Sequence, residues 1–288
     1  MKKKYLIPLI LVLISFQSCS NFTELNTETT TLNEKSVERI STVPASDSFS
    51  FVVFGDNREG FDTYEKIVAF TNELNPFFTI NTGDLVPDGS YSSYMRFLSM
   101  SEKLNMPYFV CAGNHDIRNN GRKYFRSLFG PSDYFFDYSN CRFIIIDNST
   151  SYLTDSQLSW LEQRLLTSKH KFIFMHYPPE IGNWHHTMTY NNKKFVKMME
   201  KYDVDYVFCG HIHAYDRYVK NGVTYVITGG AGAAFGLERD VSGEYINHLM
   251  VVEVNGDVIQ DTMIKVEPGA YSPPANEKFR RFKKPRRW

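Results

Sequence analysis

Short runs of apolar residues alternate with longer segments in which apolar residues recur every three or four positions. In the first part of the chain, apolar runs predict buried strands at residues 51–54, 77–80 and 108–111. Helical spacing between these runs predicts helices over residues 61–74 and 91–104. This alternation of strands and helices is typical of an α/β fold.

The second part of the chain continues the pattern and ends in strands alone. Residues 134–138 and 142–146 flank Ser139-Asn140 and predict a hairpin, and Thr154-Asp155-Ser156-Gln157 matches the capping box that opens a helix. The other predicted elements are a strand at 172–175, a helix at 193–202, and strands at 204–208, 223–227, 248–254 and 258–264, the last two joined by a turn at Asn255-Gly256-Asp257. Alternating elements followed by antiparallel strands predict an α/β sandwich with mixed sheets.

One domain accounts for most of the chain, because no internal repeat or linker interrupts residues 49–267. Residues 19–48 are rich in Thr, Ser, Asn and Glu and lack an apolar period, so we expect a flexible tether there. The 288 residues carry 32 basic and 32 acidic side chains. This neutral balance argues against nucleic-acid binding by the whole protein, which usually needs a basic face.

A basic tail at residues 268–288 departs from this neutral balance. Its last part, from Lys278 to Trp288, holds seven Lys or Arg residues together with three aromatic ones. Such a tail either contacts an anionic membrane or an acidic polymer such as nucleic acid, or is a solvated end of the chain.

The beginning of the chain resembles an export signal. Lysines precede an apolar run from Tyr5 to Phe16, which is too short to span a bilayer. Cys19 follows after Gln17 and Ser18, as in bacterial lipoprotein signals, where the cysteine becomes lipidated. The alternative is ordinary signal-peptide cleavage, with Cys19 incidental. We therefore expect residues 1–18 to be a signal peptide and the exported protein to be anchored through Cys19, facing the periplasm or the cell surface.

The three remaining cysteines are an odd number, which excludes a complete disulfide framework. Cys111 and Cys209 each end an apolar run. They are therefore either buried thiols or the partners of a single bridge.

Polar side chains follow five of the predicted strands at the point where each strand ends. They are Asp56, Asp84, Asn114-His115-Asp116, His176, and the pair His211 and His213. The carboxyl ends of strands in open α/β sheets form the functional crevice, so we expect these side chains to meet. Carboxylate, amide and imidazole donors suit divalent first-row metals, and the set is too rich for one ion. Two ions would clamp the attacking and leaving oxygens of a phosphoryl displacement.

In order and spacing, these residues resemble the calcineurin-like metallophosphoesterase family, whose motifs run G-D, G-D, G-N-H-D/E, H and G-H-x-H. The resemblance covers residues 51–232. It implies the metallophosphatase fold, a four-layer sandwich of two mixed β-sheets flanked by helices, with two metal ions at one edge. The ions would be Fe, Mn, Zn or Ni, since the donors suit all four.

The resemblance also implies a role for each position. Asp56 and His213 would bind the first metal, Asp84 would bridge both, and the second metal would be held by Asn114, His176 and His211. His115 would not bind metal but would protonate the leaving oxygen, with Asp116 holding its ring in the useful tautomer.

The sequence departs from the family pattern at two positions. Many members have Asp-x-His in the first motif, but here the third residue is Arg58. Arg58 either binds substrate phosphate, which its planar fork suits, or forms a salt bridge to Asp56 or Asp84. Members resembling purple acid phosphatases also lack that histidine but supply a tyrosine three residues after the second motif's aspartate. Pro87 stands there instead, so no tyrosinate ligand is expected.

These residues predict hydrolysis of a phosphate monoester or diester outside the cytoplasm. The substrate would be a phosphorylated small molecule or polymer, selected by the shape of the loops around residues 117–133 and 180–190. His185 and His186 in the second loop either line the pocket and bind substrate or belong to a solvated loop. One alternative is a surface lipoprotein that binds ligand without turnover, which the missing histidine favours. Another is a secreted nuclease that grips DNA with the basic tail, and a nucleotidase is a nearer variant of the same hydrolase.

Overall fold

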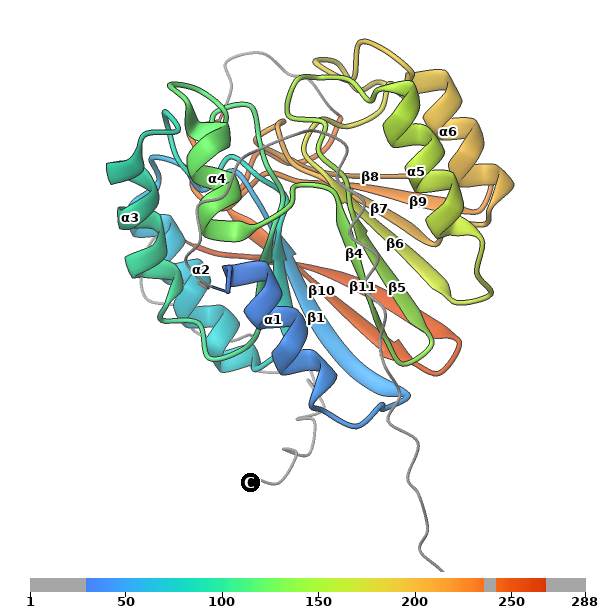
Figure 1. Ribbon diagram of the computed structural model, residues 1–288, viewed down its shortest axis with the longest axis horizontal. Coiled ribbons are helices and arrows are strands. Elements are labelled where there is room, and N and C mark those ends of the chain that lie inside the picture. The colour runs from blue at the N-terminus through green and yellow to red at the C-terminus, as the bar shows by residue number, and fades with distance from the viewer. Residues whose placement is uncertain (1–29, 236–241, 268–288) are drawn as a thin grey trace, which may run out of the picture.

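The computed structural model describes residues 30–235 and 242–267, in which two β-sheets pack face to face and helices cover their outer surfaces (Figure 1). Both sheets contain parallel and antiparallel strands. The predicted four-layer α/β sandwich is confirmed. The predicted signal peptide at residues 1–18, the lipidation site Cys19 and the basic tail at residues 268–288 lie outside the described residues.

The first sheet has five strands in the order β11-β10-β1-β2-β3. They are β1 (Ser48–Phe54), β2 (Phe78–Asn81), β3 (Tyr108–Val110), β10 (His248–Asn255) and β11 (Val258–Lys265). Helices α2 (Phe61–Leu74), α3 (Tyr91–Ser101) and α4 (Gly121–Phe129) pack on its outer face through one apolar cluster. The predicted turn joins β10 to β11 in the expected register.

The second sheet has six strands in the order β4-β5-β6-β7-β9-β8. They are β4 (Tyr134–Tyr138), β5 (Cys141–Ile145), β6 (His170–Met175), β7 (Tyr206–Cys209), β8 (Tyr215–Lys220) and β9 (Val223–Thr228). Helices α5 (Asp155–Leu165) and α6 (Asn192–Lys201) cover its outer face. The predicted hairpin is the β4–β5 pair, and the predicted capping box at Thr154 opens α5.

An aromatic layer fills the space between the sheets. The ring of Phe51 stacks on Phe78 within the first sheet, with centroids 5.2 Å apart, and meets Phe143 of the second sheet edge to face at 5.4 Å. The alternate residues of β1, Val52 and Phe54, pack instead against the outer helices. Both faces of the strand are therefore buried, which explains why the sequence shows a continuous apolar run rather than an alternating one.

The prediction of a flexible tether over residues 19–48 is wrong for its later part, where helix α1 (Leu32–Ser41) forms. Asn33 and Ser36 are buried on β3: the Ser36 hydroxyl donates to the Tyr108 carbonyl at 2.8 Å, and Asn33 accepts from the Val110 amide at 3.2 Å. Because this contact uses polar side chains, the helix shows little apolar period. The capping box from Thr31 to Glu34 was the available sequence signal.

Helix α4 is a second difference, since it occupies part of the segment 117–133 that was expected to be a loop. Cys111, Cys141 and Cys209 are all buried free thiols, so the single bridge considered between the first and last of them is not formed. Within residues 30–235 and 242–267, no helix is both long enough and apolar enough to cross a membrane.

Candidate metal centre

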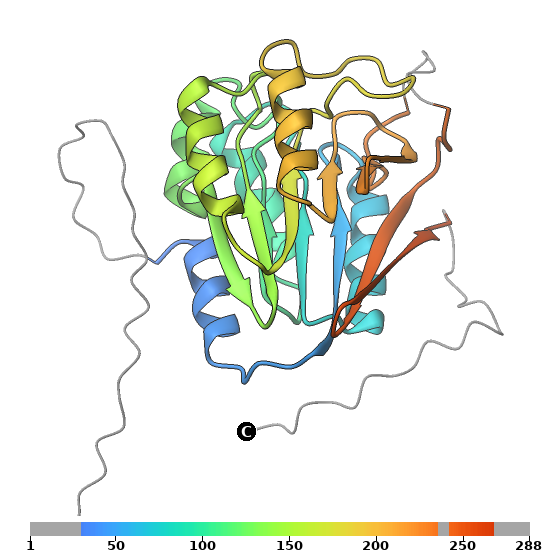
Figure 2. The same cartoon turned by 90° about the vertical axis from the view of Figure 1, so that its right-hand side faces the viewer.

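Strand ends from both sheets deliver polar side chains to one edge of the sandwich. Strands β1, β2 and β3 pair in parallel, as do β6 and β7, so the carboxyl ends within each group lie at the same edge (Figure 2). The residues that follow these ends are Asp56, Asp84, Asn114, His176, His211 and His213. All six predicted metal ligands therefore come together, as predicted from the strand-end pattern.

Tight backbone turns position these side chains. Asp56, Asp84 and His211 have positive φ angles of 60°, 54° and 68°, a region that non-glycine residues adopt at an energetic cost and often at functional sites. Glycines stand beside them because the loops approach closely: a Cβ on Gly113 would lie 2.2 Å from the Asp84 amide nitrogen, and one on Gly210 would lie 2.4 Å from Asp56 Oδ2. The glycines of these motifs are therefore steric requirements of the site.

In the half of the centre assigned to the second metal, the lone pair of His176 faces the side-chain oxygens of Asn114 and Asp84. His176 Nδ1 donates to the Thr82 carbonyl at 3.0 Å, so its Nε2 carries a lone pair. That nitrogen lies 3.1 Å from Asn114 Oδ1 and 3.3 Å from Asp84 Oδ1. His211 Nδ1 is 3.0 Å from the same Asn114 oxygen. Acceptor atoms at such distances are stabilised by a cation placed among them.

The other half has an unpaired carboxylate oxygen. Asp56 is fully buried; its Oδ2 accepts from the His211 amide at 2.9 Å, but its Oδ1 has no hydrogen-bond partner among the described residues. His213 Nε2 lies 3.6 Å from that Oδ1. Ligand atoms of Asp56, Asp84 and His213 all lie within 4.8 Å of one another. A buried acceptor without a partner is costly, and a bound metal would satisfy it.

The protonation states of these groups suit metal binding. Burial, and then the neighbouring Asp84 carboxylate, raise the pKa of Asp56 well above its usual range. Burial lowers the pKa of His176 and of His213, and it lowers the pKa of His211 to about 2. The imidazoles are therefore neutral, as metal binding requires, and the crowded carboxylates need positive charge. The residues present fit a pair of divalent ions.

His115 lies beside the ligands without joining them. Its Nδ1 donates to the Pro87 carbonyl at 2.6 Å, and its Nε2 faces the centre, 3.9 Å from Asp84 Oδ2. Its backbone amide donates to Asp84 Oδ1 at 2.8 Å. Burial lowers the pKa of His115, although the Asp84 carboxylate opposes this. A ring with a fixed Nδ1–H and an exchangeable Nε2 proton suits an acid that protonates a leaving group.

Asp116 differs from the role that the resemblance implied. Its buried carboxylate accepts three backbone N–H groups, from Leu85 at 2.9 Å, Val86 at 3.1 Å and Gly113 at 2.7 Å. The Pro87 carbonyl, and not Asp116, therefore fixes the tautomer of His115. Asp116 acts on the site by joining the loops after β2 and β3.

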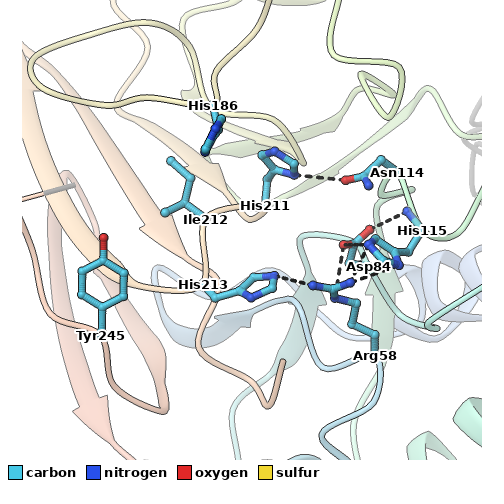
Figure 3. A pocket seen from close by; sticks show the side chains of 9 residues that line it. All are labelled: Arg58, Asp84, Asn114, His115, His186, His211, Ile212, His213 and Tyr245. Atoms are coloured by element: carbon cyan, nitrogen blue, oxygen red, sulfur yellow. Dashed lines mark hydrogen bonds and ion pairs between the residues drawn. The ribbon is translucent and has the colours of Figure 1, made fainter. Parts of the chain in front are cut away.

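Arg58 forms the salt bridge that was one of its two predicted roles, with Nε 3.7 Å from Asp84 Oδ2. Its guanidinium also contacts the Nε2 atoms of His115 and His213 (Figure 3). The side chain lines the same pocket, so the second predicted role, contact with substrate phosphate, is compatible with this position.

The pocket has a volume of about 210 Å³. Besides metal ligands, Arg58 and His115, it is lined by His186, Ile212 and Tyr245 (Figure 3). His185 and His186 are both exposed, and of the two only His186 lines the pocket. That these histidines bind substrate stays a prediction, which the pocket lining supports for His186. Tyr245 was missed, because it lies in a segment with no motif or apolar period.

Asn148 is a further residue that sequence reasoning missed. Its Oδ1 accepts the backbone amides of His176 and Tyr177 at 2.9 and 3.0 Å, which fixes the turn that presents the His176 ring. The Tyr177 ring packs on the His211 ring with centroids 3.7 Å apart. Asn148 follows an apolar run that ends at Ile146, so the strand-end pattern that identified the ligands was a signal for it as well.

A fold and site of this kind define a metal-dependent hydrolase of phosphate esters. Comparison with known families agrees: the chain belongs to the calcineurin-like phosphoesterase family, which matches residues 49–215. The protein is therefore a metallophosphoesterase, and the family uses a dinuclear metal centre.

Two relatives carry the names of phosphodiesterases. A probable glycerophosphodiester phosphodiesterase, GpdQ, of Arcobacter nitrofigilis is 26% identical over 208 residues, covering 64% of this chain and 74% of the relative. The 3',5'-cyclic adenosine monophosphate phosphodiesterase CpdA of Pseudomonas aeruginosa is 33% identical over 156 residues, covering 49% of this chain and 56% of the relative. The chain thus spans about half the length of the second relative.

Solved structures share the fold. The purple acid phosphatase PPD1 of yellow lupin superposes with a TM-score of 0.64 at 17% identity, covering 77% of this chain and 52% of that one. GAP50, the anchor in the inner membrane complex of Plasmodium, gives a TM-score of 0.62 at 13% identity, covering 78% of this chain and 87% of that one. At these identities the likeness concerns the fold alone.

Proposed function

We propose that the protein hydrolyses phosphodiesters and that it does so outside the cytoplasm. The observation that carries the ester class is the extent of the pocket beyond the metal ligands, along His186, Ile212 and Tyr245. A diester has two organic substituents, and this wall offers contacts to the one that does not leave. Both relatives described above carry phosphodiesterase names, which supports the same class.

Metal ions held by the six ligands would supply Lewis-acid polarisation of the phosphoryl group and activation of water. The protein's own groups do the remaining work. His115 transfers its Nε2 proton to the departing ester oxygen as the P–O bond breaks, and the Pro87 carbonyl keeps Nδ1 protonated throughout. Asp84 lies between both halves of the centre and accepts the His115 amide, so it fixes the acid relative to the reacting phosphorus.

Arg58 is the proposed phosphate-binding cation. Its planar guanidinium lines the pocket and is long enough to turn from Asp84 toward a non-bridging phosphate oxygen. An arginine can contact two oxygens at once, which orients the ester for cleavage.

The experiment compares an aryl phosphate diester with the matching monoester, using the chain from residue 20 onward, purified without chelator and supplied with Mn²⁺. We expect the diester to have the higher kcat/KM and EDTA to abolish its hydrolysis. The Asp84→Asn variant is the matched control for contaminating activity. A preference for the monoester would contradict the proposed ester class, and no turnover of either would favour the alternative below.

A ligand-binding lipoprotein without turnover is the second candidate, and Arg58 in place of the first-motif histidine is the observation that favours it. In that case a phosphodiester would bind but remain intact. Binding measured by calorimetry without product formation would distinguish this function.

Export and anchoring rest on the sequence signal that ends at Cys19. We propose that Cys19 is lipidated and holds the domain at a bacterial membrane. Metabolic labelling with a radioactive fatty acid should mark the wild-type chain and leave Cys19→Ala unlabelled. Labelling of both chains would place the modification elsewhere.

A further inference from the structure

The guanidinium of Arg58 lies where the ligands of the first metal converge. Its Nε is 3.7 Å from Asp84 Oδ2, one terminal nitrogen is 3.0 Å from His213 Nε2, and the other contacts His115 Nε2. Figure 3 shows the guanidinium between these side chains. The Arg58 side chain is only 15% exposed, so most of this charge is withdrawn from water.

The contact with His213 uses the lone pair that a metal would need. His213 Nδ1 donates its proton to the Ala234 carbonyl, which can only accept. The neutral ring therefore has one lone pair, on Nε2. An arginine N–H can only donate, so it takes that lone pair in the hydrogen bond at 3.0 Å. A metal ion and Arg58 cannot both bind the same lone pair.

One ligand atom of the first metal, Asp56 Oδ1, remains open to an ion. Asp56 Oδ1 is buried without a hydrogen-bond partner among the described residues and lies 3.6 Å from His213 Nε2. On the far side, Asn114 Oδ1 meets the rings of both His176 and His211 directly. The two halves of the centre therefore differ: one has mutually facing acceptors, and the other already contains a cation.

We infer that Arg58 and the first metal ion exclude each other at His213 Nε2, so that the two metal sites differ in affinity. The second site, at Asn114, His176 and His211, binds tightly. The first site fills only when the guanidinium leaves, and the exposed carboxylate of Glu59, 3.6 Å from Arg58 Nε, remains a partner after that movement. The same exchange frees His115 Nε2 to carry a proton. This inference rests on the dinuclear centre of the proposed function.

The test is a Mn²⁺ titration of the metal-stripped full chain by isothermal calorimetry, with elemental analysis of the bound metal. We expect the wild-type protein to bind one ion tightly and a second ion more weakly. In Arg58→Gln the weaker ion, the one at the first metal site, should bind at least about tenfold more tightly, because a unit positive charge within about 4 Å of that site is removed. Arg58→His, which restores the imidazole of many family members, should show the same change and serves if the first variant fails to fold.

Arg118→Gln is the matched control, since it removes an exposed arginine three residues after His115. It should leave both affinities unchanged. Equal affinities for two ions in the wild-type chain, or unchanged affinities in both Arg58 variants, would overturn the inference, as would an equal gain in Arg118→Gln. No bound ion in any chain would overturn the metal centre as well. A normal titration without diester hydrolysis would refute the proposed function and leave this inference standing.

Discussion

Replacing Asp116 by asparagine tests whether this residue joins the loops of the site or orients His115. The carboxylate receives two backbone N–H groups on Oδ1, from Leu85 and Val86, and one on Oδ2, from Gly113. Asparagine can keep the first two, because its carbonyl oxygen can occupy the Oδ1 position. Its NH₂ group would then face the Gly113 N–H at a distance that is 2.7 Å in the native protein, donor against donor.

The expected loss follows from these contacts. One charge-assisted hydrogen bond is lost and leaves a buried N–H group without a partner, which costs about 2–3 kcal/mol, and two others become neutral, which costs about 0.5 kcal/mol each. Relief of the repulsion between Asp116 and Asp84 offsets part of this, since burial and then Asp84 raise the pKa of Asp116 well above its usual range. We expect a net loss of about 2 kcal/mol in the metal-loaded protein, where bound cations already reduce that repulsion.

The assay is urea unfolding at pH 7 followed by tryptophan fluorescence, with and without Mn²⁺, combined with the pH profile of kcat/KM. Asp88→Asn is the control, because Asp88 accepts one backbone amide, that of Ser90 at 3.0 Å. Asparagine can still accept this amide, so the variant's free energy of unfolding should fall by less than about 0.5 kcal/mol. The reasoning would be refuted if Asp116→Asn were as stable as the wild-type protein while the part of its kcat/KM profile that reports His115 moved to another pH. That pattern would indicate that Asp116 sets the tautomer of the His115 ring, as the family resemblance implied.

Three further predictions concern the ligands, the acid and the core. Asp84→Asn should lower bound metal from two ions to fewer than one, measured by elemental analysis; two retained ions would exclude a bridging role. His115→Asn should keep the metal but lower kcat about 10²–10⁴-fold for a poor leaving group, and much less for a nitrophenolate, which needs no proton; an equal loss for both leaving groups would contradict acid catalysis. Burial lowers the pKa of His248 to about 4, so the unfolded chain binds the proton more readily. Stability should therefore fall between pH 6.5 and pH 4, by about 3 kcal/mol in total from this residue. His248→Asn keeps a donor for the Ile246 carbonyl. Between pH 7 and pH 4.5, its free energy of unfolding in urea should therefore fall by less than that of the wild-type protein.

Much of the fold and most of the site could be predicted from the sequence, for a physical reason that particular residues illustrate. Val52 and Val53 face opposite sides of β1 and both are buried, so the strand is apolar throughout and is recognised without a partner. The ligands stand directly after such strands, and parallel pairing carries their ends to one edge. Order along the chain therefore predicted proximity in space for Asp56, Asp84 and His176.

The choice of hydrogen-bond partners was decided only by the tertiary structure. The resemblance assigned the ring of His115 to its neighbour Asp116, yet the Pro87 carbonyl is the group within reach. Helix α1 is held to the domain by buried polar contacts of Asn33 and Ser36 as well as by Ile40 in the core, so its apolar period is weak.

Arg58 shows the same limit at the centre itself. The sequence identified it as a departure from the family motif and left two roles open. Its contact with His213 joins residues 155 positions apart, and the lone pair it occupies depends on the Ala234 carbonyl behind that ring. Local patterns report burial and backbone geometry, because these act on neighbouring residues. Competition for one lone pair depends on distances between remote segments, which only the packed sheets establish.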